Sequence, residues 1–497
     1  MSIENLSRRR FLQTSAGAAS LGAAVLSWRG RPALASRGHP GLASPRSDAP
    51  ASFQERGRGV ANAQFRVGEP QDALATKEQG RDALATATAP LAPPNEAIRR
   101  AREAALSVLK PSPKDLEHGL ELHANSLVFE SYGFAPRAAP DGDVIRRAME
   151  AGASEAELGD LREELPMIRM ATDERERQEF LEAFRAAGVT CVFQNAGEES
   201  NDPLRLIKRL ARFTYATDLL RDEVFKAVSP DDIVTAKRQN RLCLYFSANG
   251  VPLPQQWHNV RDELGFICVF QQLGIRMMHV TYNRRNPLGD GCGEATDGGL
   301  SDFGRAAVAE MNRVGVIVDV AHSGWRTSLD AAKASQQPMV ASHTTAEGLH
   351  RHIRSKPDEV IRAICDTGGL VGICCISGFL GGAGHIGTFL DHVDYVAKKF
   401  GVEHVAIGTD IAYESRHAAA ERAKIPKRPA GSPSLPRWEA LWPEGSLSGR
   451  ADPSLAWTNW PLFTVGLVQR GYSDDAIQKI LGGNILRVAR AVWESRT

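Results

Sequence analysis

Residues 315–345, GVIVDVAHSGWRTSLDAAKASQQPMVASHTT, decide the fold that we expect for this chain. The stretch holds two short apolar runs, Val316 to Val320 and Met339 to Ala341. A helix-like segment, Thr327 to Ser335, lies between them. His322 and His343 each follow one apolar run. This order is typical of a β-α-β unit, in which parallel strands bring the side chains at their carboxyl ends to one edge. We therefore expect the two histidines to lie together as candidate ligands of a transition metal.

The same alternation of apolar runs and helical segments continues through the chain. The runs expected to form strands are 119–122, 188–193, 242–246, 275–281, 316–320, 339–341, 370–376 and 404–407. Eight runs, each but the last followed by helical material, predict an α/β fold of the (β/α)8 TIM-barrel type. A doubly wound open sheet is the alternative, and it is weaker because no glycine-rich phosphate loop follows the first run.

The amino terminus has the three parts of an export signal in order. Twin arginines, Arg8 and Arg9, precede an apolar segment of small residues from Ala16 to Leu26, and Ala33-Leu34-Ala35 has the pattern of a cleavage site. The apolar segment is shorter than the ~20 residues that span a bilayer. We predict that residues 1–35 are a removable Tat signal, so that the mature protein is periplasmic or extracellular and has no integral membrane span.

Composition limits the remaining possibilities. Residues 36–95 are rich in small and polar residues, which predicts a disordered low-complexity tether before a catalytic domain at 96–497. The 497-residue chain has a formal charge of +1, so it shows no electrostatic signature of nucleic-acid binding. Its seven cysteines are scattered, which favours small buried residues over a disulfide framework or a zinc knot.

Two irregular regions interrupt the expected barrel. Residues 141–187 are charge-rich with helical spacing, which predicts a solvated helical insertion. Residues 412–460 are rich in Pro, Arg and Trp. We interpret this loop as a cover over the barrel mouth or an oligomer contact, which leaves a homodimer possible, although core packing of the tryptophans is equally compatible. A helical extension, from about Ser473 to Trp493, ends the chain.

The expected strand ends carry a set of polar side chains suited to metal chemistry: His123, Asn125, Asn249, Tyr282, His322, His343 and Asp410. Imidazoles with a carboxylate suit zinc, which lowers the pKa of bound water and polarises a carbonyl. Asp410 could bind the metal or transfer a proton. Arg354, with Arg351 as its alternative, could hold a substrate carboxylate. The class of reaction indicated is metal-assisted hydrolysis.

Six motifs, taken in order, resemble the membrane (renal-type) dipeptidase family of zinc peptidases, family M19. They are GIRMMHVTYNRRNPLGDG, GLSDFGRAAVAEMNRVGVIVDVAHSG, PMVASHTTAEGLHRHIRSKPDEVI, GGLVGICCISGF, HVAIGTD and GYSDDAIQKILGGNILRV, and the resemblance covers about residues 115–497. It implies a TIM barrel of the metallo-dependent hydrolase type, whose two-zinc centre cleaves a small peptide substrate, a dipeptide, and in some members β-lactams or related amides.

The resemblance also implies roles for individual residues. His123 corresponds to the ligand on the first strand, His322 and His343 to the ligands of the second metal, Asp410 to the catalytic aspartate, and Arg354 to the arginine that binds the substrate carboxylate.

The chain departs from the family at three positions. Asn125 and Asn249 stand where the family has an aspartate and a bridging glutamate, and Tyr282 stands where it has a substrate-polarising histidine. Amides are weak neutral ligands, so the first metal position is the one these changes affect. Glu294 or Asp290 is a candidate to replace the bridging carboxylate.

Three hypotheses follow. The first is an exported zinc dipeptidase in which Asp410 and Tyr282 are catalytic and Arg354 and Tyr282 bind substrate. The second is an amidase or lactonase with a single metal. The third is a catalytically impaired peptide-binding homologue. Metal stoichiometry distinguishes the first two, and turnover distinguishes both from the third.

Overall fold

The structure, a computed structural model, describes residues 95–197, 202–427 and 451–496. The predicted export signal and the tether up to residue 94 lie outside the described residues. Within the described part of the chain, no helix is long and apolar enough to cross a membrane.

Eight parallel strands form the central sheet, as the alternation predicted. They follow one another in the order β1 (Phe129–Gly133), β2 (Cys191–Asn195), β4 (Leu242–Ala248), β5 (Ile275–His279), β6 (Ile317–Asp319), β7 (Val340–Thr344), β8 (Leu370–Ile373) and β9 (Val405–Ile407). A short additional strand, β3 (Val224–Lys226), pairs with the first half of β4. The sheet nearly closes on itself, because Asp410 after β9 donates its backbone N–H to the Tyr132 carbonyl of β1 at 3.4 Å. The predicted TIM-barrel fold is confirmed.

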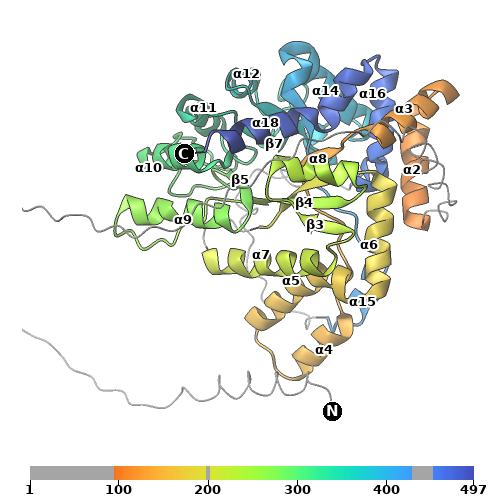
Figure 1. Cartoon of the computed structure of the whole chain (residues 1–497), viewed down its shortest axis with the longest axis horizontal. Coiled ribbons are helices and arrows are strands. Elements are labelled where there is room, and N and C mark those ends of the chain that lie inside the picture. The colour runs from red at the N-terminus through yellow and green to blue at the C-terminus, as the bar shows by residue number, and fades with distance from the viewer. Residues whose placement is uncertain (1–94, 198–201, 428–450, 497) are drawn as a thin grey trace, which may run out of the picture. The chain divides into compact units, whose positions relative to one another are not determined.

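Helices surround the sheet and separate most of its strands (Figure 1). The helices are α2 (Glu96–Leu109), α3 (Pro113–Asn125), α4 (Gly142–Glu150), α5 (Glu155–Thr172), α6 (Glu174–Ala187), α7 (Pro203–Leu219), α8 (Pro230–Arg238), α9 (Val260–Gln272), α10 (Asp302–Val314), α11 (Trp325–Ala334), α12 (Asp358–Asp366), α13 (Ser377–Leu380), α14 (Ile386–Phe400), α15 (Ala418–Ala423), α16 (Trp460–Gln469), α17 (Asp474–Gln478) and α18 (Asn484–Glu494). Because both faces of each barrel strand are covered, the strands are buried along almost all of their length.

The first strand is not the one that we expected. Residues 119–122 lie in α3, which begins with Ser112 as N-cap and Pro113 in its first turn. The first barrel strand is instead β1, whose sequence FESYG has polar residues in its interior, Glu130 and Ser131, and is nevertheless buried along its length. His123 and Asn125 therefore belong to a helix outside the barrel and not to a strand end.

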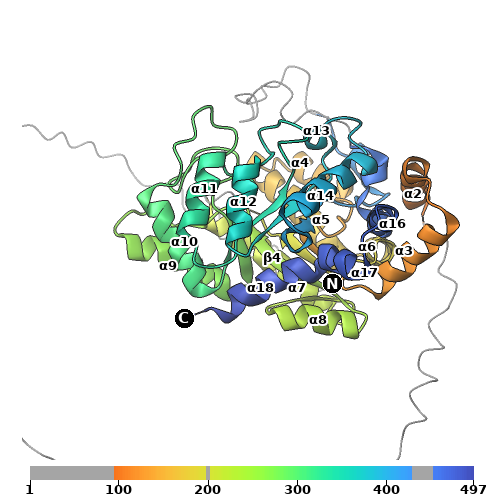
Figure 2. The same cartoon turned by 90° about the horizontal axis from the view of Figure 1, so that it is seen from above.

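Two cores hold the barrel together. One lies between the strands and the surrounding helices, and the other fills the barrel interior with residues such as Phe129, Phe193, Met277 and Leu370. Helix α18 contributes Val488 to the interior core, and it packs against β1, β6, β8 and β9. Figure 2 shows α18 passing next to α8. The carboxyl-terminal helix thus packs onto the interior core of the barrel.

The insertion at 141–187 forms α4, α5 and α6. The expectation of a solvated excursion is wrong for α5 and α6, because Met167, Met170, Phe180 and Phe184 are buried. These residues follow helical spacing on the covered face of each helix. The insertion is therefore part of the domain core.

In the tryptophan-rich segment, Trp457 and Trp460 are fully buried, which supports core packing for these two residues. The Trp457 indole N–H donates to Glu130 Oε2 at 2.8 Å and so joins this segment to β1. Trp438 and Trp442 lie outside the described residues. All seven cysteines are free, and none forms a disulfide.

Candidate metal centre and active site

His322 and His343 lie next to each other, edge to face, as their positions after neighbouring strands predicted. Their Nε2 atoms are 2.9 Å apart, and their side chains are 3 % and 0 % exposed. His343 lies within β7, and His322 follows β6 by three residues. The parallel strands therefore deliver both imidazoles to the same point.

The surroundings fix which ring nitrogen of His343 carries a proton. Ser342 Oγ donates to the Asp319 carboxylate, which accepts hydrogen bonds but cannot donate them when ionised. The same hydroxyl must therefore accept from His343 Nδ1, which lies 2.8 Å away. Nδ1 then carries the proton, and Nε2 presents a lone pair.

The same reasoning applies to His322. Its Nδ1 lies 2.6 Å from the Asn283 amide oxygen, which is an acceptor, so this nitrogen carries the proton. The two Nε2 lone pairs then lie 2.9 Å apart, an arrangement that is repulsive unless both nitrogens bind the same cation. Burial, reinforced by the Arg354 cation, lowers the pKa of both imidazoles well below the usual value and disfavours a proton there. The donor pair therefore fits a divalent metal ion.

Aromatic rings enclose the histidine pair. Tyr132 of β1 stacks on His343 with ring centroids 3.8 Å apart, and Tyr282 stacks on His322 at 4.0 Å. The Tyr132 hydroxyl donates to Asn249 Oδ1 at 2.7 Å. The structure thus brings together Asn249, Tyr282, His322 and His343, and it adds Tyr132, which sequence reasoning missed because β1 was not recognised.

Arg354 and Asp410 border the same centre. The Arg354 side chain is 3 % exposed and donates from Nη2 to the His343 carbonyl at 3.2 Å, while its buried Nε has no hydrogen-bond partner among the described residues. Arg351, the alternative, is exposed and pairs loosely with Glu347 at 3.9 Å. Burial raises the pKa of Asp410 to about 6, and the nearby Arg354 cation partly opposes that rise. A buried cation next to a carboxyl of raised pKa is typical of an active site.

His123 and Asn125 do not reach the centre, and their prediction as metal ligands is wrong. His123 Nδ1 lies 2.8 Å from Thr464 Oγ1 and its Nε2 lies 2.9 Å from the Ala187 carbonyl, so both nitrogens serve packing between helices. Burial lowers the pKa of His123 to about 4. Asn125 is exposed at the end of α3. The residues at the end of β1 are Tyr132 and Phe134, which cannot replace a histidine and an aspartate as ligands.

Neither Glu294 nor Asp290 supplies the missing carboxylate. Both Asp290 oxygens contact the Arg285 side chain, and Oδ2 also accepts the Gly298 N–H. Glu294 Oε1 accepts the Arg285 backbone N–H at 2.8 Å. The two carboxylates therefore hold the loop after Tyr282. The described residues fit the second metal position of the family but do not fit the first.

Two further polar residues lie inside the barrel beside the histidine pair. His279 ends β5 and Asp319 ends β6, and one ligand atom from each lies within 4.8 Å of one from His343. The sequence contained a weak signal for both, since each is a polar residue within a mostly apolar run.

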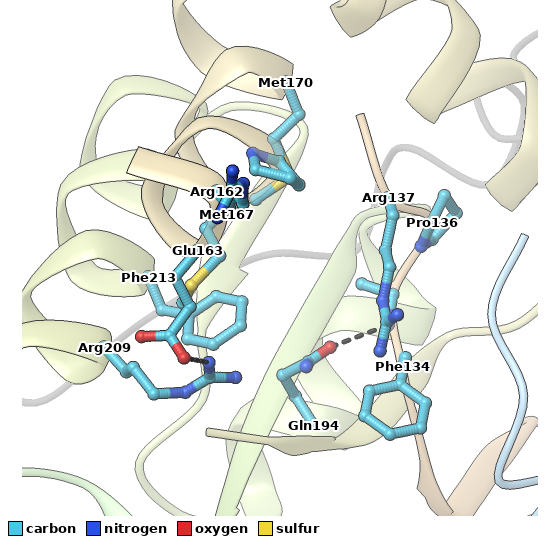
Figure 3. Close-up of a pocket in the computed structure, with 12 residues that line it drawn as sticks. Phe134, Pro136, Arg137, Arg162, Glu163, Met167, Met170, Gln194, Arg209 and Phe213 are labelled. Atoms are coloured by element: carbon cyan, nitrogen blue, oxygen red, sulfur yellow. Dashed lines mark hydrogen bonds and ion pairs between the residues drawn. The ribbon is translucent and has the colours of Figure 1, made fainter. Parts of the chain in front are cut away.

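A cavity of about 220 Å³ lies next to this centre, beside the end of β1. Figure 3 shows Phe134, Pro136 and Arg137 facing Met167 and other residues of α5 across the cavity. The Phe134 ring lies 6.0 Å from that of Tyr132, which itself stacks on His343. The remaining lining residues are Ala135, Arg162, Glu163, Pro166, Met170, Gln194, Arg209 and Phe213.

Comparison with known proteins identifies the family. Residues 160–421, more than half of the chain, match the family model described as membrane dipeptidase, peptidase family M19. Dipeptidase tcpJ of Claviceps purpurea is 26% identical over 280 residues, which are 55% of this chain and 57% of that protein. An uncharacterized dipeptidase of Schizosaccharomyces pombe is 31% identical over 189 residues, 36% of this chain and 44% of that protein.

The chain thus spans about half the length of the curated relatives that it matches. Among solved structures, an amidohydrolase from Pseudomonas aeruginosa is 26% identical with a TM-score of 0.56, and the match covers 76% of this chain and 99% of that one. The fold, the six motifs and the family match agree, and the chain belongs to the membrane dipeptidase family, peptidase family M19.

Proposed function

We propose that the protein is a zinc-dependent hydrolase of the dipeptidase type that uses one metal ion, held by His322 and His343. The observation that carries the proposal is the pair of Nε2 lone pairs that lie 2.9 Å apart. Bound there, a zinc ion would acidify a water molecule and polarise the scissile carbonyl. One metal is proposed because Tyr132, Phe134 and Asn249 stand where the first metal of the family would need a histidine and two carboxylates, and Tyr132 and Asn249 bond to each other.

The chain's own residues would position the substrate. The Arg354 guanidinium, which is buried with an unsatisfied Nε, would bind the terminal carboxylate of a dipeptide. Asp410 would accept a proton from the attacking water and return it to the leaving amine, a role that suits a pKa near 6. Tyr282, stacked on His322, would donate its hydroxyl to the oxygen that becomes negative in the transition state.

The cavity beside β1 would receive one side chain of the substrate. Its lining residue Phe134 packs against the Tyr132 ring, and Met167, Met170 and Phe213 give the cavity an apolar wall. The guanidinium of Arg137 lies over the Phe134 ring at 4.5 Å and adds a positive charge. An extended side chain with an apolar stem fits this lining, which also holds charged residues.

The test is hydrolysis of a panel of dipeptides by the purified full chain. We expect turnover that a chelator abolishes and zinc restores, and that is lost in His322→Gln and His343→Gln. Amidation of the dipeptide's carboxyl terminus should raise KM, since Arg354 would lose its partner. Zinc binding without turnover of any dipeptide or amide would reject the hydrolase.

That last result would favour a peptide-binding homologue as the second candidate. The specific observation in its favour is the hydrogen bond of 2.7 Å between Tyr132 and Asn249, because two neutral side chains stand at the first metal position. A binding homologue should retain affinity for dipeptides, measured by calorimetry, without cleaving them.

We also propose that the protein is exported by the Tat route. The support is the sequence alone, with Arg8 and Arg9 before an apolar segment and an Ala-x-Ala site. Replacing both arginines by lysine should leave the precursor in the cytoplasm of a Tat-competent bacterial host, whereas the parent chain should appear in the periplasm shortened by about 35 residues. Equal export of both proteins would reject this route.

A further inference from the structure

The histidine pair borders a group of polar residues that neither the family resemblance nor the proposed mechanism uses. His279 and Asp319 are the last residues of β5 and β6, and the register of the sheet pairs them directly. His343 lies on the next strand, β7. All three side chains are 0 % exposed. The barrel therefore places two imidazoles and a carboxylate side by side where no solvent reaches them.

His279 lacks the hydrogen bonds that a buried imidazole normally makes. Its Nε2 lies 2.8 Å from Asp319 Oδ2, but the contact does not have hydrogen-bonding geometry, and neither ring nitrogen has a hydrogen-bond partner among the described residues. Burying a polar group without a partner is unfavourable. Two ligand atoms that approach closely without a hydrogen bond are, however, what a shared metal ion requires.

Asp319 is held in a fixed orientation by its neighbours. Its Oδ1 accepts the backbone N–H groups of Ala321 at 2.9 Å and of Ser342 at 3.1 Å, while Oδ2 accepts the Ser342 hydroxyl and faces His279. The same hydroxyl accepts from His343 Nδ1, which leaves His343 Nε2 with its lone pair. Hydrogen bonds of this kind orient metal ligands and set their tautomers.

The spacing of the imidazoles matches a common ion. The ring centroids of His279, His322 and His343 are 4.9 to 5.4 Å apart. Imidazoles that bind one zinc ion through nitrogens at about 2.0–2.1 Å have centres roughly 5 Å apart. One ligand atom from each of His279, Asp319 and His343 lies within 4.8 Å of the other two.

We propose that His279 and Asp319, together with His343, are ligands of the single divalent transition-metal ion at the histidine pair and bind it from the inner side of the pair. Two imidazoles and a carboxylate are a donor set for zinc and its first-row neighbours. Asp319 supplies the anionic ligand that Asn249, Glu294 and Asp290 do not. The reaction assigned to this ion depends on the proposed function. The assignment of its ligands does not.

The experiment measures metal binding by the full chain after removal of metal with a chelator. Zn²⁺ is titrated calorimetrically into the parent chain, His279→Gln, His279→Phe and Asp319→Asn. His123→Gln is the matched control, since His123 is an equally buried histidine with both nitrogens bonded elsewhere. We expect the three site variants to bind Zn²⁺ at least 10-fold more weakly than the parent and the control to be unchanged.

Two further readouts keep the test independent of folding and of activity. Co²⁺ bound to the parent should give a visible absorption spectrum, and this spectrum should change in His279→Phe. Phenylalanine keeps an aromatic ring at position 279, so this variant remains informative if Asp319→Asn fails to fold. Zn²⁺ should raise the melting temperature of the parent but not of His279→Phe.

Each result has a defined meaning. Unchanged Zn²⁺ affinity and an unchanged Co²⁺ spectrum in the His279 variants, with loss in His322→Gln, would overturn the inference and leave the proposed function standing. Weakened binding in the His279 variants, with no dipeptide cleaved by the zinc-loaded parent, would support the inference and reject the function.

Discussion

The Asp410 carboxyl group should determine how the activity depends on pH. Burial raises its pKa to about 6, so the group is protonated below that pH and cannot accept a proton. We predict that kcat/KM rises about tenfold per pH unit below pH ~6 and levels off above it. Asp410→Asn should reduce kcat by at least ~100-fold and remove this limb of the profile. A profile with the same limb in Asp410→Asn would assign the titration to another group.

Arg354 should act on substrate binding rather than on folding. Replacing it with methionine removes a buried cation and its charge-assisted hydrogen bonds, which are worth about 1.5–3 kcal/mol. We predict that Arg354→Met raises KM for free dipeptides by roughly 10- to 100-fold and changes KM for amidated dipeptides little. Arg351→Met is the control, because that side chain is 81% exposed and should leave KM unchanged. An equal effect on amidated substrates would argue against carboxylate binding.

At the scale of single elements, α5 should set the size of the side chain that the substrate presents. Met167 lines the cavity of about 220 Å³, so Met167→Trp would fill much of it. We predict that kcat/KM falls at least ~10-fold for dipeptides with bulky side chains and stays near the parent value for glycylglycine. Ala156→Trp, an exposed position on the same helix, is the control. An equal loss for all substrates would indicate a damaged fold instead.

Glu130 should make the closure of the barrel depend on pH. It lies fully buried in β1, accepts the Thr409 N–H after β9 at 3.1 Å, and has its pKa raised from 4.5 to about 8 by burial. The folded state therefore retains a proton that the unfolded chain loses above pH 4.5. The free energy of unfolding should fall by about 1.4 kcal/mol per pH unit between pH ~5 and ~8.

Denaturant unfolding at several pH values measures this slope. Glu130→Gln should remove Glu130's share of the slope, while the loss of the acceptor for Trp457 lowers stability by about 1–3 kcal/mol at every pH. The same pH dependence in Glu130→Gln would contradict the assignment.

The sequence predicted most of the barrel because strands buried on both faces are apolar runs. It failed at β1 for the same reason, since Glu130 and Ser131 interrupt the apolar pattern of FESYG. The run at 119–122 was preferred, although Ser112 and Pro113 mark the start of a helix. Polar residues that close the barrel form hydrogen bonds with residues far away in the sequence, as Glu130 does with Trp457. A local sequence pattern cannot reveal such contacts.

For the whole molecule, the sequence predicted best those site residues that directly follow an apolar run. The positions of His322 and His343 followed from the alternation alone. His279 and Asp319 were missed because their meeting depends on the register between β5 and β6, which the tertiary structure sets. His123 was misplaced together with its strand, and Arg354 could be separated from Arg351 only by burial.

The metal content of the full chain, measured by mass spectrometry on protein purified without chelator, tests the central claim most directly. We predict close to one zinc ion per chain, lost in the double variant His322→Gln, His343→Gln and retained in His123→Gln. A value near zero after growth with added zinc would contradict the account, and so would two ions per chain of which His123→Gln loses one.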